Sequence, residues 1–205
     1  MPALDTTQLL AIAAALGWAS GLRLYAVVFL TGLAGHLGWV ELPSGLRLLE
    51  MPVVLWASGS MLVVEFLADK IPLVDSMWDA LHTVIRIPAG AALAAGVFGG
   101  DHASWTLVAA LAGGTLAATA HTAKASARAA VNTSPEPFSN IGLSLIEDGA
   151  VPVALWLAFN HPVWFFVALA LALVLMVTLI VLMVKFVKLV FRRLRDGMPS
   201  PQAEP

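Results

Sequence analysis

The sequence contains no cysteine and few charged residues, and both absences limit what the protein can be. Without cysteine, the chain can form no disulfide, no thiolate metal site and no cysteine nucleophile. Charged residues make up 12% of the 205 residues and hydrophobic residues 60%, whereas a soluble domain carries about 25% charged residues. So few charges cannot cover a surface that faces water, and lipid is therefore the expected solvent for most of the chain.

The sequence also lacks a basic excess and any recognised catalytic motif. The formal net charge is −2, which gives no basis for binding nucleic acid. No nucleophile elbow, phosphate-binding Walker loop, zinc-protease motif or dinucleotide fingerprint is present. The sequence therefore implies no cofactor, and an enzyme is less expected than a protein that binds or moves something.

Apolar runs recur along the whole chain. A helix that spans the bilayer needs about 20 apolar residues, and several of the runs are shorter than this. Seven segments stand out: residues 9–20, 24–40, 51–67, 87–98, 105–120, 141–159 and 163–184. The sequence predicts an all-α, polytopic transmembrane helix bundle of six or seven segments, with at least one of them short, broken or re-entrant.

Two stretches leave an alternative open. The first two segments are joined by only three residues that end at Arg23, so they form either two full spans or a re-entrant hairpin with Arg23 at its tip. Residues 68–86 carry an apolar stripe at helical spacing, which is typical of an amphipathic helix on the membrane or between spans. We expect the membrane-embedded core at 8–160, after a short N-terminal tail at 1–7. A long terminal transmembrane helix with a basic end should follow at 161–195, and then a disordered tail at 196–205.

The charges and tryptophans predict the orientation. If every segment crosses the bilayer, Arg47 faces one side and the other ten of the 11 lysine and arginine residues face the opposite side. Short loops rich in lysine and arginine favour the cytoplasm. Four tryptophans fall at the segment ends on the side away from these ten basic residues, where an aromatic belt forms: Trp39, Trp105, Trp156 and Trp164. Both patterns predict a cytoplasmic C-terminus.

Ionisable residues inside an apolar chain are costly and therefore mark candidate sites. Arg23 follows Gly17 and Gly21, which share a helix face that another backbone can approach closely. Its guanidinium suits an anion or a lipid phosphate, or else it snorkels to the interface. Glu65 and Asp69 also share a helix face and are candidates for proton or cation coupling, or for a structural ion pair.

Three further groups of charged residues follow along the chain. Asp75, Asp79 and His82 lie on one helical stripe and are weak candidates for a divalent metal, or form the solvated face of a helix. A basic stripe could hold an anionic headgroup or could be ordinary positive-inside charge: it contains His121, Lys124 and Arg128. The sixth segment is interrupted by two adjacent carboxylates, Glu147 and Asp148. They indicate either a polar cavity or a span that begins only after Gly149, with the preceding helix in the interface.

Three of these stretches together resemble a known family. They are residues 17–25, residues 65–72 with Asp75 and Asp79, and residues 134–140 with Glu147 and Asp148. In this order they are similar to an uncharacterised family of bacterial integral membrane proteins, domain of unknown function 4126. The resemblance covers roughly residues 8–160. It implies a multi-spanning fold in the bacterial inner membrane and carries no established activity.

The residues favour a transporter-like, multi-pass protein with a polar site that faces the cytoplasm. Its ligand would be a small ion, an anionic solute or a lipid headgroup. The expected binding residues are Arg23, Glu65, Asp69, Lys124, Arg128, Glu147 and Asp148. A membrane scaffold or assembly partner is the alternative, and it requires the charges to form closed internal pairs. A metal-dependent enzyme that uses Asp75, Asp79 and His82 is a further alternative. Glycines in the apolar segments also permit a homo-oligomer.

Overall fold

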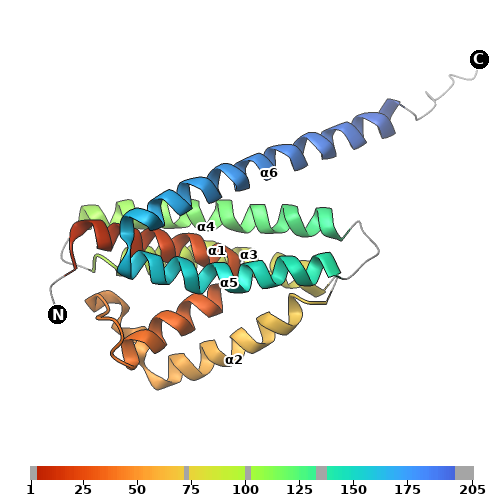
Figure 1. Cartoon of the computed structure of the whole chain (residues 1–205). Coiled ribbons are helices and arrows are strands. Elements are labelled where there is room, and N and C mark those ends of the chain that lie inside the picture. The colour runs from red at the N-terminus through yellow and green to blue at the C-terminus, as the bar shows by residue number, and fades with distance from the viewer. Residues whose placement is uncertain (1–3, 72–73, 100–102, 133–137, 197–205) are drawn as a thin grey trace, which may run out of the picture.

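The described part of the chain consists of helices. The structure is a computed structural model, and it describes residues 4–71, 74–99, 103–132 and 138–196. In chain order the elements are α1 (Thr6–His36), the short 3-10 helix η1 (Ser44–Glu50), α2 (Pro52–Ala68), α3 (Val74–Gly96), α4 (Ala103–Val131), α5 (Phe138–Asn160) and α6 (Pro162–Asp196) (Figure 1). The predicted all-α bundle is therefore confirmed. The tail expected to be disordered lies, apart from Asp196, outside the described residues.

Helix α1 reverses its direction at Arg23. The backbone of Arg23 is not helical, with φ −145° and ψ 84°. Before this break Gly17 lies against Gly113 of α4, and the two helices run in the same direction. After the break Phe29 contacts Gly59 of α2, and the two helices run in opposite directions. Since α2 and α4 run the same way, α1 is a helical hairpin with both ends at one end of the bundle (Figure 1).

The tip of the hairpin lies inside the protein. Its arms, residues 6–22 and 24–36, are about 25 Å and about 20 Å long at a rise of about 1.5 Å per residue. Both are shorter than a hydrocarbon core of about 30 Å, and Arg23 at the tip is 0% exposed. Of the two alternatives left open by the sequence, this geometry favours the re-entrant hairpin.

Helix α3 corrects one predicted boundary. The fourth apolar segment was expected to begin at residue 87, but the helix begins at Val74 and contains Pro88 in its interior. The amphipathic stretch and the apolar segment are thus one helix of 23 residues. Its buried stripe runs from Asp75 to Ala94 and packs mainly against α4 and α1. The amphipathic part therefore packs between helices instead of lying flat on the membrane.

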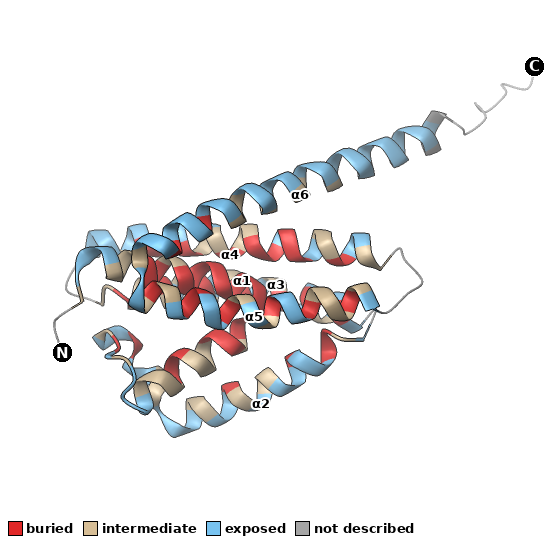
Figure 2. Ribbon diagram, in the orientation of Figure 1, coloured by how far each residue is buried: buried red, intermediate tan, exposed pale blue. Residues whose placement is uncertain are grey.

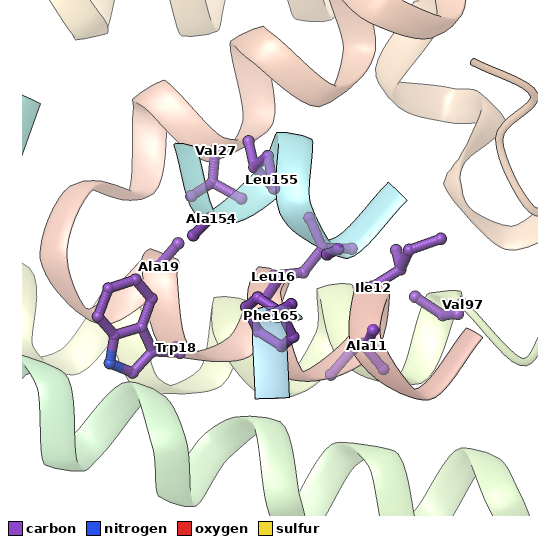
Figure 3. Packing of buried hydrophobic residues seen from close by; sticks show 14 of the residues in the cluster. Ala11, Ile12, Leu16, Trp18, Ala19, Val27, Val97, Ala154, Leu155 and Phe165 are labelled. Atoms are coloured by element: carbon purple, nitrogen blue, oxygen red, sulfur yellow. The ribbon is translucent and has the colours of Figure 1, made fainter. Parts of the chain in front are cut away.

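Most of the outer surface is apolar, as a lipid-facing surface must be. Among the described residues, four helices are long and apolar enough to cross a membrane: α4, α5, α6 and, when its two arms are taken together, α1. There are five if η1 and α2, which meet at a bend of 69°, form one span. Helix α6 is the most exposed (Figure 2), and Phe165 and Leu169 are its buried core residues. They join a hydrophobic cluster built around α1. Figure 3 shows part of it, with Leu16 of α1 and Leu155 of α5.

Candidate functional site: a buried ionic network

The charged residues singled out in the sequence meet in one place. Five cationic and six acidic side chains are linked by ion pairs of 2.6 to 3.9 Å. We call them the ionic network. Its members come from α1 to α5 and the turn after α2: Arg23, Lys70, Arg86, Lys124, Arg128, Glu65, Asp69, Asp75, Asp79, Glu147 and Asp148. Lys70 and Asp148 are the most exposed members, at 22% and 20% of their side chains.

Asp69 is the most connected carboxylate. It caps the C-terminal end of α2, where its N–H donates to the carbonyl of Glu65. Its Oδ2 lies 2.9 Å from Lys124 Nζ, 3.1 Å from Arg23 Nη1 and 3.9 Å from Arg128 Nη2. One fully buried carboxylate oxygen therefore ties the hairpin tip to two positions on α4.

The hairpin tip is held by α4 and α5. Arg23 Nη2 lies 2.9 Å from Asp148 Oδ1 and donates to Ser144 Oγ at 2.9 Å. The break in α1 also needs partners for its freed carbonyls, and Lys124 Nζ donates to the carbonyl of Leu22 at 3.2 Å. Non-helical backbone at membrane depth is tolerated where protein groups satisfy it, and the ammonium group of Lys124 does so for the carbonyl of Leu22.

A second centre lies around Arg86 of α3. Its guanidinium joins Glu65 Oε1 at 2.7 Å and Asp79 Oδ1 at 2.6 Å. Lys124 Nζ lies 3.3 Å from the same Asp79 oxygen and 3.3 Å from Glu147 Oε2. Lys124 thereby connects the carboxylate of Asp69 with that of Asp79 beside Arg86, and it also contacts Glu147.

Arg128 closes the network near the start of α5. It lies 3.2 Å from Glu147 Oε2 and 3.5 Å from Asp75 Oδ2, and it donates to the side-chain oxygen of Asn140. Its Nη1 also donates to the backbone carbonyl of Asp69 at 2.8 Å. Since the last described part of α4 and the first turns of α5 meet here, Arg128 fixes how α5 enters the bundle.

Two histidines lie beside the network, and the partners of their ring nitrogens differ. His82 Nδ1 donates to the carbonyl of Trp78 at 2.8 Å, and its Nε2 lies 3.1 Å from the Tyr25 hydroxyl. His121 Nδ1 faces an Arg86 N–H at 3.4 Å and accepts. Its Nε2 donates to Thr83 Oγ1 at 2.7 Å, because that hydroxyl donates to the carbonyl of Asp79.

The structure brings together all seven residues expected to bind a ligand. Glu147 and Asp148 diverge around α5, yet both carboxylates reach cations of the network. The metal candidates have other partners: Asp75 and Asp79 contact cations, and His82 contacts tyrosine. Among the described residues, no group of three or more acidic, histidine or cysteine side chains could hold a metal ion.

Sequence reasoning missed two polar partners of the network, Asn140 and Ser144. Both are buried, and they contact Arg128 and Arg23, respectively. Their spacing carries a usable signal, because Asn140, Ser144 and Glu147 recur at steps of four and three on one face of α5. A polar stripe on an otherwise apolar helix indicates the face that packs inward.

The four described pockets lie away from the ionic charges. Of these, the one nearest to the network is an apolar groove of about 520 Å³ between the second arm of α1, α2 and α3. Tyr25, the partner of His82, lines it together with Ser58 and Met61. A polar pocket lined by Glu41, Arg47 and Glu50 lies near the C-terminal end of α1. None of the four is lined by a member of the ionic network.

These features define a class of protein: a multi-pass helical membrane protein with a helical hairpin whose tip is embedded in buried charges. The family model described as "Domain of unknown function (DUF4126)" matches residues 10–182. Because the match covers most of the chain, the protein belongs to this family. No curated protein and no solved structure matches the chain.

Proposed function

We propose that the protein is transporter-like and that the ionic network at the hairpin tip is its ligand site. The supporting observation is Arg23, a fully buried cation at a break in a re-entrant helix. Discontinuous helices with charged residues near mid-membrane form the binding sites of many transporters. An intramembrane charge is also costly enough to mark a function by default.

The proposed ligand is a small ion, an anionic solute or a lipid headgroup. An anionic group at the tip would replace a carboxylate as the partner of Arg23 or Lys124. Asp148 is the carboxylate most easily displaced from Arg23, because its side chain is 20% exposed while that of Asp69 is 0% exposed. Guanidinium and ammonium groups both bind phosphate or carboxylate well.

We further propose that the end of the bundle that holds the ionic network faces the cytoplasm, because most lysine and arginine residues lie on that side. The chain has no cysteine, so one introduced thiol reports its own side without a background. We expect Asn160→Cys, at the tryptophan end, to react with a membrane-impermeant maleimide in intact cells. Ser76→Cys should react only after the cells are opened. Both residues are exposed, and the reverse labelling pattern would contradict this orientation.

A thermal-shift screen of the detergent-purified protein tests the binding site. The probes are monovalent ions, inorganic phosphate, small carboxylates and anionic lipids. A ligand that binds the folded state raises the melting temperature by mass action, by about 2.7 kcal/mol of stabilisation at a concentration of about 100 Kd. We expect such a probe to stabilise the wild type and Arg47→Ala, which lies on η1, but not Arg23→Ala.

A second function, that of a non-transporting scaffold, is favoured by the closed pairing of the charges. Every cation of the network has at least one carboxylate within 4.0 Å. In this case no probe shifts the wild type, and Arg23→Ala melts earlier whatever is added. That result would favour the scaffold function over the transporter function.

A further inference from the structure

The ionic network carries one more carboxylate than it has cations. Five cationic and six acidic side chains leave a formal charge of −1 when all are ionised. His121 adds no charge, because its Nδ1 accepts from Arg86 and its Nε2 carries the one ring proton. His82 forms no ion pair with a carboxylate among the described residues, and its ring nitrogens face the Trp78 carbonyl and the Tyr25 hydroxyl. An uncompensated charge in a buried site costs several kcal/mol.

No other lysine or arginine supplies the missing charge. All 11 lysine and arginine residues of the chain lie in the described part. Outside the network there is Arg47 on η1, and five more are exposed on the last turns of α6: Lys185, Lys188, Arg192, Arg193 and Arg195. Among the described residues, no group of three or more acidic, histidine or cysteine side chains is placed to hold a metal ion. A proton is the smallest cation that can supply the charge.

Glu65 is the carboxylate with the weakest support for its charge. Among the described residues, its one ion pair is with Arg86, which it shares with Asp79. Asp79, Glu147 and Asp148 each meet two cations, and Asp69 meets three. Asp75 has one cation, but it also accepts from the Ser76 N–H at 2.6 Å and from the Asn132 amide.

One oxygen of Glu65 is buried without a hydrogen-bond partner among the described residues. Glu65 is 0% exposed, and among the described residues its Oε2 has no hydrogen-bond partner. Charged and titratable groups surround it from every neighbouring helix: Arg23 and Tyr25 of α1, Asp79 and Arg86 of α3, Lys124 of α4, and Asp69 at the end of α2 itself. Arg86 also has Asp79 as a partner, at 2.6 Å.

We propose that Glu65 holds one proton at Oε2 and that this proton is the ligand that neutralises the ionic network. The proton comes from water and returns to it, and the step makes or breaks only the O–H bond. When the proton leaves, the network gains a negative charge and must bind a cation or open. The role as a coupling ion rests on the proposed function, whereas the protonation itself rests on the charge count and geometry.

Infrared spectroscopy of the full-length protein in detergent tests the proposal without any substrate. A buried protonated carboxyl group gives a C=O stretching band that shifts in D₂O and is absent for a carboxylate. We expect this band in the wild type near neutral pH. Glu65→Asp should move it, because the two acids differ in frequency, and Glu147→Asp should leave it in place. Absence of the band, or a band that follows Glu147, would overturn the proposal.

Two amide variants provide a second measurement if an aspartate variant does not fold. Glu65→Gln mimics the protonated acid, so its melting temperature should stay within about 3 °C of the wild type. Glu147→Gln removes one carboxylate from the network, so the charge count predicts that the band disappears. Where Glu147→Asp keeps the band in place, this loss reports the charge of the network and not a proton held by Glu147. A large fall in the melting temperature of Glu65→Gln would overturn the proposal. A band that responds as expected while no probe binds would instead contradict the transporter function alone.

Discussion

Replacing Asp69 with alanine is expected to lower the free energy of unfolding by about 3–5 kcal/mol, the usual cost of removing one partner from a buried ion pair. Asp69 is fully buried, and its carboxylate faces three cations from two helices. Without it, Arg23 loses its partner on the α2 side and keeps only the partially exposed Asp148. Thermal or denaturant unfolding in a mild detergent measures the change.

A matched control separates this effect from a general loss of acidic charge. Glu41 is exposed and lies outside the network, in the segment between α1 and η1, so Glu41→Ala should change stability by no more than about 0.5 kcal/mol. Asp69→Asn keeps the shape of the side chain and one acceptor oxygen, so its stability should lie between those of Asp69→Ala and Glu41→Ala. Equal stability of Asp69→Ala and Glu41→Ala would show that the network does not hold the fold together.

Replacing Gly21 with leucine is the second change with a large expected effect. Gly21 lies where the first arm of α1 crosses α4, and a Cβ added there would lie 2.8 Å from the Cβ of Ala120 and closer still to the carbonyl oxygen of Ala117. A backbone oxygen cannot rotate away, so the helices must separate. Overpacking of this kind costs about 1–3 kcal/mol, and it also moves Arg23, two residues further on.

Gly149 of α5 provides the control for the glycine substitution. It is exposed, lies in a helix next to the network, and has no atom within 4 Å of an added Cβ. Gly149→Leu should be neutral or stabilising by up to about 1 kcal/mol, since leucine favours the helix. The comparison is made on melting temperatures in the same detergent. If the two leucine variants melt together, the close approach of α1 and α4 is not needed.

The cost of buried charge bears on why the network exists. Replacing buried ion pairs with well-packed hydrophobic residues is often neutral or stabilising. Eleven charged side chains therefore give this bundle little stability that leucine and phenylalanine could not supply. A site that binds or releases a charged ligand needs such groups, and so does a re-entrant break whose carbonyls require donors.

The sequence by itself determined the solvent, the helical class and the residues of interest. In a chain with 60% hydrophobic residues and 12% charged residues, too few polar side chains are present to cover a surface that faces water. The cost of charge in lipid then marks Arg23, Glu65 and Glu147 as residues with a role. These conclusions depend on transfer free energies, which act residue by residue and need no knowledge of contacts.

The sequence was less informative about helix boundaries. Residues 71–86 alternate charged and apolar side chains at helical spacing, and Pro88 resembles a helix start. The chain continues as one helix through Pro88, because the buried stripe from Asp75 to Ala94 packs against α1 and α4. Tertiary packing therefore outweighs the local tendency of proline to begin a helix.

Only the tertiary structure decided which charges meet. Arg23 and Asp148 are separated by most of the chain, yet their side chains lie 2.9 Å apart because the hairpin of α1 ends beside α5. The spacing of charges on each helix gives the face that they occupy but not the depth or the partner. Those depend on how closely glycines such as Gly21 let the helices approach and on where α1 turns back. The sequence thus determined that buried charges need partners, and the fold decided which oxygen each cation meets.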